Sequence, residues 1–315
     1  QHMNKPKILI TGASGFVGRN LVGLMESRGT YPSLFTHELC DLTEQSTVRT
    51  ILNYYQPDIV IHLAGLVGGI MANKERPAEF NYRNLVMGAM MLHESWEAGV
   101  KKYLTLIGGC SYPAIGNSPI KENELFNGYP QRESAPYSLA KAMSFVQAQA
   151  YRKQYGFNAV VLVPGNMYGP HDNFDLNNSH VIPALIRKFI NAKTSMLSEV
   201  VAWGTGSPIR DFVYVEDVCE AILLALENYN SSDLINISSG IPVSIKLLTE
   251  SIAKIVEFTG RIIWDETKPD GQMNKQFDVT RMKQVLKYEC RTDLETGLRK
   301  TIDWVNANWK TVGKI

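Results

Sequence analysis

The segment that decides the fold is KPKILITGASGFVGRNLVGLMESRG, residues 5–29. Residues 7–11 form a short apolar run typical of a buried strand, and the apolar positions that follow the loop are spaced as on one face of a helix. Gly12, Gly15 and Gly18 lie between the two patterns. Glycines at this spacing allow a tight turn and a close approach of the backbone to a pyrophosphate, whose charge a helix N-terminus favours. The segment therefore predicts a strand–loop–helix unit that binds a dinucleotide.

The same alternation continues through the first half of the chain. Strands are expected at 58–65, 102–109 and 158–165, with helices at 43–55 and 84–98. Because each strand is apolar on both faces, a parallel sheet covered by helices on both sides is expected. We predict an α/β protein with a doubly wound parallel Rossmann sheet in a dinucleotide-binding domain over 4–165, to which later segments return.

From residue 166 the pattern becomes more polar and richer in turns, which favours a smaller, mostly C-terminal α/β substrate-binding domain over 166–315. Helices are expected near 181–191, 218–227 and 245–258, and strands near VVAWG, FVYV and INISSG. Without a flexible linker in the sequence, the two domains are expected to share a cleft.

Composition narrows the range of partners. The chain has 315 residues, 44% of them hydrophobic, and a net charge of +1, so it lacks the charge excess typical of proteins that bind nucleic acids or acidic membrane surfaces. The four cysteines are widely spaced, which favours neither a disulfide framework nor a metal site. We expect a cytoplasmic protein with a small-molecule ligand.

A candidate catalytic pair lies in APYSLAK, where Tyr137 and Lys141 are four residues apart at the start of a predicted helix. This spacing places both side chains on one helical face. A lysine ammonium beside a phenol is expected to lower the phenol's pKa, so that Tyr137 can act as an acid or base near neutral pH. The alternative is an ordinary exposed pair on a helix surface.

Several further blocks give the sequence a specific resemblance. They are HLAGLVGGI, CSYP, NGYP, APYSLAK, YGPHDNF, NSHVIPALIRK, VVAWGTGSPIRDFVYVEDV and KPDGQ. With the glycine loop, they resemble the extended short-chain dehydrogenase/reductase family and, within it, the GDP-L-fucose synthases. The resemblance implies an NADP(H)-dependent 3,5-epimerase/4-reductase that converts GDP-4-keto-6-deoxy-D-mannose, or a related GDP-4-keto sugar, to a GDP-L-fucose-type product. It also implies a homodimer.

In this resemblance Cys110 and His180 match the residues that epimerise the sugar. A 4-keto group acidifies the hydrogens at C3 and C5, so inversion needs one group to remove a proton and another to return it from the opposite face. A thiolate suits the first role and an imidazolium the second. The alternative reading is a buried core cysteine and a histidine that caps a turn.

The resemblance further assigns the ligand contacts. Cofactor binding is expected from Gly12, Ser14, Gly15, Phe16, Val17, Gly18, Asp41, Leu42, Leu63, Ala64, Tyr137, Lys141, Pro164, Asn166, Met167 and His180. Substrate binding is expected from Asn166, Arg187, Trp203, Arg210, Asp270 and Lys275, with Trp203 stacked on the base and Arg210 and Lys275 on the diphosphate and ribose. Trp203 in a core and Arg187 on a solvated helix face are the alternatives.

The choice between NADP(H) and NAD depends on the second predicted strand, SLFTHELCDL. It ends without the lone acidic residue expected to hold a ribose diol, and Asp41 is better placed near the adenine. NADP(H) is therefore favoured, although Glu38 argues mildly for NAD.

One position departs from the family pattern. A Ser or Thr is usual two residues before the epimerisation cysteine, where its hydroxyl completes a triad with the tyrosine and lysine, but this chain has Gly108. Ser111, a backbone N–H of the Gly108–Gly109 turn or a water could replace the hydroxyl, or a differently shaped substrate could need the space. The alternatives for function are a 4-reductase or a 4-epimerase without C3/C5 epimerisation, and a sensor that binds without turnover.

Overall fold

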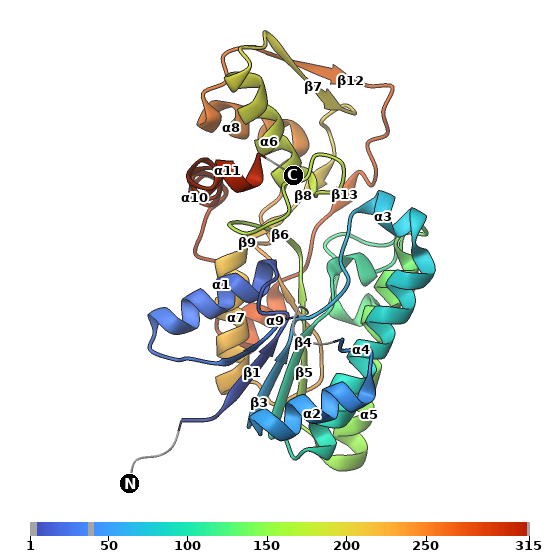
Figure 1. Ribbon diagram of the computed structural model, residues 1–315. Helices are drawn as coiled ribbons and strands as arrows, with labels where there is room; N and C mark the ends of the chain where they lie inside the picture. The colour runs from blue at the N-terminus through green and yellow to red at the C-terminus, as the bar shows by residue number, and fades with distance from the viewer. Residues whose placement is uncertain (1–4, 37–40, 314–315) are drawn as a thin grey trace.

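The computed structural model of the chain describes residues 5–36 and 41–313 (Figure 1). Its centre is a six-stranded, wholly parallel sheet in the order β10-β5-β4-β3-β1-β2. The strands are β1 (Ile8–Thr11), β2 (Ser33–Phe35), β3 (Ile59–His62), β4 (Lys102–Leu106), β5 (Ala159–Pro164) and β10 (Ile235–Ile237). The central strands are almost fully buried, because Val, Ile and Leu face a helical layer on each side.

Two helical layers cover this sheet (Figure 1). One contains α1 (Phe16–Ser27), α7 (Val215–Asn228) and α9 (Thr280–Val285), and the other contains α2 (Gln45–Tyr55), α4 (Pro77–Glu97) and α5 (Ala135–Tyr155). The short α3 (Ile70–Glu75) precedes α4. The predicted doubly wound α/β fold is confirmed.

The order of the strands reverses between β1 and β3, so the loops that follow these two strands diverge to opposite sides. In open α/β sheets, ligands bind at such a point, outside the carboxyl ends of the strands. The glycine loop after β1, the loop after β3 and the Cys110 turn after β4 all leave the sheet at this edge.

A smaller part lies beyond the carboxyl edge of the sheet (Figure 1). Its core is formed by helices α6 (Val181–Thr194), α8 (Ile245–Val256), α10 (Leu294–Ala307) and α11 (Trp309–Val312). Its short sheets are β11 (Val243–Ser244)-β8 (Ile209–Arg210)-β13 (Asn274–Lys275) and β12 (Arg261–Asp265)-β7 (Glu199–Trp203). The pair β6 (Asn166–Tyr168) and β9 (Phe212–Tyr214) joins it to the large sheet.

Two elements differ from the sequence prediction. INISSG was expected in the smaller domain, but β10 pairs with β5 at the end of the large sheet, because Ile235 and Ile237 are buried there. Helix α4 begins at Pro77 rather than at Asn84, since proline is well tolerated in the first helical turn. The division of the chain at residue 165 stays a prediction.

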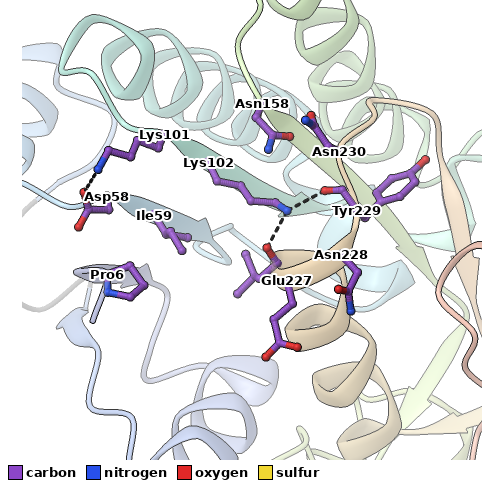
Figure 2. A pocket seen from close by; sticks show the side chains of 11 residues that line it. Pro6, Asp58, Ile59, Lys101, Lys102, Asn158, Glu227, Asn228, Tyr229 and Asn230 are labelled. Carbon is purple, nitrogen blue, oxygen red and sulfur yellow. Dashed lines mark hydrogen bonds and ion pairs between the residues drawn. The ribbon is translucent and has the colours of Figure 1, made fainter. Parts of the chain in front are cut away.

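A cavity of about 490 Å³ opens at the amino ends of the strands, opposite the glycine loop (Figure 2). Lys102 reaches across it, and its Nζ donates to the backbone oxygens of Ala225, Leu226 and Tyr229 at 2.7–2.8 Å. The lysine thus satisfies carbonyls at the C-terminal end of α7, where a positive charge is favourable. Burial lowers its pKa to about 8. We assign this group a structural role, in fixing α7 to the sheet.

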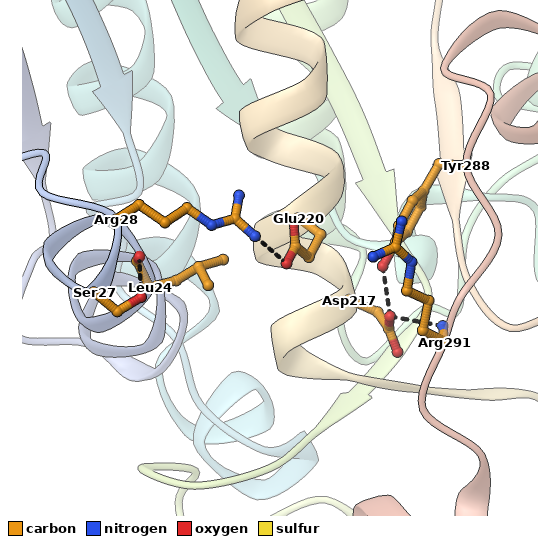
Figure 3. Close-up of polar contacts among 7 residues, drawn as sticks. All are labelled: Leu24, Ser27, Arg28, Asp217, Glu220, Tyr288 and Arg291. Atoms are coloured by element: carbon orange, nitrogen blue, oxygen red, sulfur yellow. Dashed lines mark hydrogen bonds and ion pairs between the residues drawn. The ribbon is translucent and has the colours of Figure 1, made fainter.

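The segment after α9 is fastened to α7 by a buried carboxylate (Figure 3). Asp217 accepts hydrogen bonds from the Tyr288 hydroxyl at 2.5 Å and from the backbone N–H groups of Arg291 and Thr292 at 2.9 and 3.2 Å. One turn further along the same helix, Glu220 forms an exposed ion pair with Arg28 of α1. None of the described helices is long and apolar enough to cross a membrane.

Candidate functional site

The glycine loop after β1 has the shape that the sequence predicted. Gly12 has a φ of +69°, and a Cβ there would lie 2.5 Å from the backbone nitrogen of Ala64. A Cβ on Gly18 would lie 2.2 Å from the oxygen of Gly12. Gly15 is the N-cap of α1 and is exposed, so the N–H groups at the start of that helix face the open end of the loop. A side chain at Gly12 or Gly18 would thus collide with backbone, so these glycines let the loop pack closely against the loop after β3 and the start of α1, an arrangement that suits a pyrophosphate.

Ser14, Phe16 and Val17 lie within or directly after this loop, while Leu63 and Ala64 follow β3 beside it. The backbone N–H of Leu63 donates to the oxygen of Thr11 at 3.1 Å, and that of Ala64 to the Thr11 hydroxyl at 3.3 Å. These bonds hold the ends of β1 and β3 together. The structure therefore brings the predicted residues of both loops to one edge of the sheet.

Asp41 begins the described chain beyond β2. Its carboxylate accepts hydrogen bonds from the N–H and hydroxyl of Thr43 at 2.9 and 2.7 Å and lies 3.5 Å from Arg83. The two bonds from Thr43 are the main reason that its pKa is lowered. Leu42 is buried in the core. Glu38, which argued for NAD, lies outside the described residues.

Tyr137 and Lys141 occupy the first turns of α5, as predicted, and both are half-buried. The ring of Phe80 packs edge-on against Tyr137, with 6.3 Å between centroids. Lys141 points toward the loop after β3, where its Nζ lies 3.9 Å from the position that a Cβ on Gly65 would take. Lys141 therefore faces the loop after β3 at the carboxyl edge of the sheet.

The protonation of this pair differs from the sequence expectation. Burial, and then the charge of Cys110, raise the pKa of Tyr137 instead of lowering it. Burial also lowers the pKa of Lys141 to about 8, against a smaller opposite effect of Cys110. The protein alone thus holds Tyr137 as a neutral phenol, which is the form that can donate a proton.

Cys110 lies at the centre of a single 3₁₀ turn, Gly109–Ser111, that follows β4. The Ser111 hydroxyl donates to the backbone oxygen of Ser138 at 2.9 Å and so fixes the turn to α5. This bond holds the turn that carries the half-buried thiol against the first turns of α5, and the charge of Cys110 affects the pKa values of both Tyr137 and Lys141, as expected for a thiol close to the pair. Cys110 is therefore part of the site, and the alternative of a core cysteine does not fit its position.

His180 is the N-cap residue of α6 and borders the site from the smaller part. The loop that carries it is held to the loop after β3, because the N–H of Gly69 donates to Asn178 Oδ1 at 2.6 Å. The ring is exposed to solvent, yet desolvation by the surrounding protein, and then the charge of Lys275, lower its pKa. Its neutral form is favoured in the ligand-free protein.

Arg210 and Lys275 lie opposite each other on the parallel strands β8 and β13. Both are half-buried, and desolvation is the main cause that lowers both pKa values. Lys275 is also within electrostatic range of Cys110. The two cations thus extend the site from the thiol into the smaller part, as expected for residues that meet a diphosphate.

The sequence analysis missed Asp211, a fully buried carboxylate between these elements. It accepts hydrogen bonds from the Ser238 hydroxyl at 2.5 Å and the N–H of Phe277 at 2.8 Å, while its backbone oxygen accepts from Asn166 Nδ2 at 3.1 Å. Burial raises its pKa to about 6. Phe277 in turn packs on Gly109, where a Cβ would lie 2.5 Å from the ring.

Asp211 thereby joins strand ends from both parts of the molecule to the turn that holds Cys110. Asn166, predicted to contact ligands, stands at the first position of β6, two residues beyond Pro164 and next to Met167. A sequence signal for Asp211 was available in the charged pair that interrupts the apolar PIRDFVYV segment.

Trp203 lies at the end of β7, and 65% of its surface is exposed, so it is not a core residue. The ammonium groups of Lys188 and Lys268 lie 6.0 and 5.4 Å from the centre of its ring. An exposed indole with two cations beside it can stack on a base and offset phosphate charge.

Arg187, in contrast, is turned away from this surface. It is 6% exposed in the core of the smaller part, where Nη1 donates to the oxygen of Phe174 at 3.1 Å. Successive helical residues point about 100° apart, so Lys188 projects toward Trp203 when Arg187 faces the core. The burial of Arg187 therefore favours Lys188 as the cation that faces a ligand beside Trp203, and the substrate contact itself stays a prediction.

Asp270 contacts the loop after Trp203. Its two carboxylate oxygens accept hydrogen bonds from the N–H and hydroxyl of Thr205, both at 2.7 Å. It therefore orders the loop beside the exposed indole. A cavity of about 410 Å³, lined by Pro113, Ile115 and Lys275 among others, continues from the Cys110 turn. Within the described residues, no three His, Cys, Asp or Glu side chains are grouped so that they could hold a metal ion.

Comparisons with known proteins show the family of this chain. The model of the NAD dependent epimerase/dehydratase family matches residues 8–238. GDP-L-fucose synthase 1 of Arabidopsis thaliana is 40% identical over 303 residues, which span 96% of this chain and 94% of that protein.

Two solved structures share the fold across both parts. A GDP-6-OMe-4-keto-L-xylo-heptose reductase from Campylobacter jejuni has a TM-score of 0.90 and 28% identity, and the match covers 96% of this chain and 98% of that one. A GDP-L-fucose synthetase from Naegleria fowleri bound to NADP has a TM-score of 0.90 and 26% identity, and the match covers 98% of this chain and 96% of that one. This chain belongs to the NAD dependent epimerase/dehydratase family and, within it, to the GDP-L-fucose synthases.

Proposed function

We propose that this protein is an NADP(H)-dependent epimerase/reductase that converts GDP-4-keto-6-deoxy-D-mannose, or a closely related GDP-4-keto sugar, to a GDP-L-fucose-type product. The observation that carries the proposal is the Ser111–Ser138 hydrogen bond, because it sets a thiol beside a Tyr–Lys pair at the end of a dinucleotide cradle. The names of the relatives support the substrate class, and the NADP-bound relative supports the cofactor.

The residues of the cradle fit a dinucleotide, since the exposed Gly15 leaves the N–H groups at the start of α1 open to a ligand. Ser14, Gly15, Phe16 and the N-terminus of α1 would hold the pyrophosphate, and Lys141 would bind the nicotinamide ribose. When bound, NADPH supplies the hydride for C4 of the sugar. Tyr137 contributes the phenol proton to the C4 oxygen, because burial keeps this phenol protonated in the ligand-free protein.

Cys110 and His180 act on the keto sugar before it is reduced. The thiolate of Cys110 removes a proton from the carbon next to the ketone, so that the C–H bond breaks, an S–H bond forms and the electron pair enters the enolate. His180, on the opposite wall, returns a proton to the other face of the same carbon. A bound diphosphate near Lys275 would offset the positive charge that disfavours the imidazolium form of His180.

The nucleotide end of the substrate extends over the smaller part. Trp203 would stack on the guanine, while Arg210, Lys275 and Lys188 would offset the diphosphate charge. Asn166 would contact the sugar, and Asp270 would order the Thr205 loop beside the base. The 65% exposure of Trp203 beside the ammonium groups of Lys188 and Lys268 supports a role in binding, because an accessible indole can stack on a base while the cations offset phosphate charge.

The test is incubation of the protein with NADPH and GDP-4-keto-6-deoxy-D-mannose in deuterated water. We expect loss of NADPH absorbance, deuterium at C3 and C5 of the product, and inverted configuration at both carbons by NMR. No NADPH oxidation with several GDP-4-keto sugars, despite measurable binding of NADPH, would reject the proposal and favour a sensor.

A second candidate is a GDP-sugar 4-reductase without epimerisation, favoured by Gly108 and by the likeness to the Campylobacter jejuni reductase. In that case NADPH is oxidised but C3 and C5 keep their configuration and incorporate no deuterium. The NMR spectrum of the same reaction separates the two functions. A 4-epimerase would instead invert C4 without net use of NADPH.

We also propose a cytoplasmic homodimer that pairs α4 and α5 of each subunit. The apolar side chains of Tyr82, Leu85, Met143 and Val146 on these helices are 38–61% exposed. Pairing would bury them in a four-helix interface. Light scattering that shows a monomer at micromolar concentration would contradict the dimer.

A further inference from the structure

The space beside Gly108 is filled by the thiol of Cys110. A Cβ on Gly108 would lie 3.0 Å from Cys110 Sγ, and the next atom within reach is the backbone nitrogen of Cys110 at 3.9 Å. This contact is tighter than an ordinary van der Waals approach, so a side chain at residue 108 would require the thiol to shift, whereas glycine lets the sulfur lie close to the backbone there. Apart from the two chain neighbours of Gly108, the thiol is thus the one side chain of the described residues within 4 Å of the position that a Cβ at residue 108 would take.

Ser111, the nearest hydroxyl in sequence, is already committed elsewhere. It is 1% exposed, and its Oγ donates to the backbone oxygen of Ser138. It therefore cannot turn toward a substrate without releasing the 3₁₀ turn from α5. Its bond instead fixes Cys110 next to Tyr137, and the electrostatic effect of Cys110 on both Tyr137 and Lys141 agrees with this proximity.

We propose that Cys110 has a second catalytic role, as the hydrogen-bond donor that replaces the triad hydroxyl at the C4 oxygen of the substrate. The inference rests on the proposed epimerase/reductase function and deepens it. Once the sulfur has taken a proton from carbon it carries S–H, which is the form that can donate a hydrogen bond. The same group then stabilises the negative charge that develops on the oxygen while hydride adds to C4 and Tyr137 transfers its proton. The thiol keeps its own proton in this step.

Hydride transfer can be measured apart from epimerisation in the reverse direction, by initial rates of GDP-L-fucose oxidation with NADP⁺. Forward and reverse reactions share one transition state, so loss of a donor slows both. A backbone or side-chain donor to an oxyanion contributes about 10²- to 10³-fold, and an S–H group is a weaker donor. We expect Cys110→Ala to lower this rate by about 10- to 100-fold. Cys110→Ser, which retains a donor, should keep at least several times the rate of the alanine variant.

A double variant gives the sharper test. Adding Gly108→Ser to Cys110→Ala places a hydroxyl where the sulfur was, without the 3.0 Å contact that the native thiol would make. Hydride transfer should recover, whereas deuterium exchange at C3 and C5 stays absent. The matched control, Gly108→Ala with Cys110→Ala, adds the Cβ without the hydroxyl and should restore nothing.

NADP⁺ affinity, measured for every variant, confirms that each still folds and binds the cofactor. A hydride-transfer rate of Cys110→Ala equal to that of the wild type overturns the second role and points to a backbone N–H as the donor. Failure of Gly108→Ser to rescue the rate overturns it as well. By contrast, absence of any reaction in the wild-type protein overturns the proposed function itself, so the two failures are distinguishable.

Discussion

Replacing Gly12 with alanine should damage cofactor binding through a clash rather than through backbone strain. Gly12 and Gly29 have nearly the same φ, +69° and +71°, so alanine at either position costs about 1 kcal/mol of strain. At Gly29 the added methyl meets no atom within 4 Å. At Gly12 it lies 2.5–2.8 Å from the backbone of Leu63 and Ala64, about 1 Å closer than carbon atoms normally approach.

The loop after β3 or the glycine loop must therefore shift by about 1 Å, a displacement that can cost about 100-fold in a positioned site. We expect Gly12→Ala to raise the Kd for NADPH about 100-fold, equivalent to about 2.7 kcal/mol, as measured by fluorescence titration. Gly29→Ala should lower the free energy of unfolding by about 1 kcal/mol and leave NADPH affinity unchanged. Equal NADPH affinities for the two variants would refute the steric argument.

Three further outcomes are expected. Lys188→Ala should raise the Kd for GDP about 10-fold with little change in the free energy of unfolding. Arg187→Ala should leave GDP binding intact but lower the free energy of unfolding by about 2 kcal/mol, because the oxygen of Phe174 loses its donor. Calorimetry measures GDP binding and urea unfolding measures stability, and the reverse pattern would contradict the preference for Lys188. Burial, and then the charge of Lys141, lower the pKa of His62 from 6.5 to about 3, so its stabilising contribution is complete above pH 6.5 and is lost as pH falls toward 3. The free energy of unfolding should therefore drop by about 2 kcal/mol between pH 7 and 5. An equal drop in His62→Gln would assign the pH dependence to other groups. Asp217→Ala should cost about 3 kcal/mol, because it removes the acceptor of the buried Tyr288 hydroxyl and of two partly buried N–H groups. Glu220→Ala, which removes a partly exposed ion pair on the same helix, should cost less than 1 kcal/mol, and similar losses in urea unfolding would contradict this difference.

The features that could be predicted from sequence are those set by local spacing. The glycines around Gly15, the apolar runs of the central strands and the four-residue interval between Tyr137 and Lys141 each define their structure within one turn or one strand. For this reason the Rossmann sheet and the position of the Tyr–Lys pair were predicted correctly. The individual ligand contacts, including that of His180, stay predictions.

The features that could not be predicted depend on side-chain direction or on distant partners. Arg187 and Lys188 are neighbouring cations in the block NSHVIPALIRK, and the choice between them required knowing which helical face is buried. Asp211 gains its importance from Ser238 and Phe277, which lie far along the chain. The pKa of Tyr137 is raised because burial outweighs any charge effect, and the extent of burial is not readable from a heptapeptide.

The path of the chain between the two parts has a consequence for how the protein unfolds and how it can be divided. After β5 the chain enters the smaller part, returns for α7 and β10, leaves for β11 and α8, returns for α9 and leaves again for α10. A fragment ending at residue 165 would lack β10 and α7 and would expose Leu162 and Val160 along an unpaired strand. Neither part is therefore an excisable module, and thermal melting should be a single cooperative transition in which the cofactor cradle and the sugar pocket are lost together.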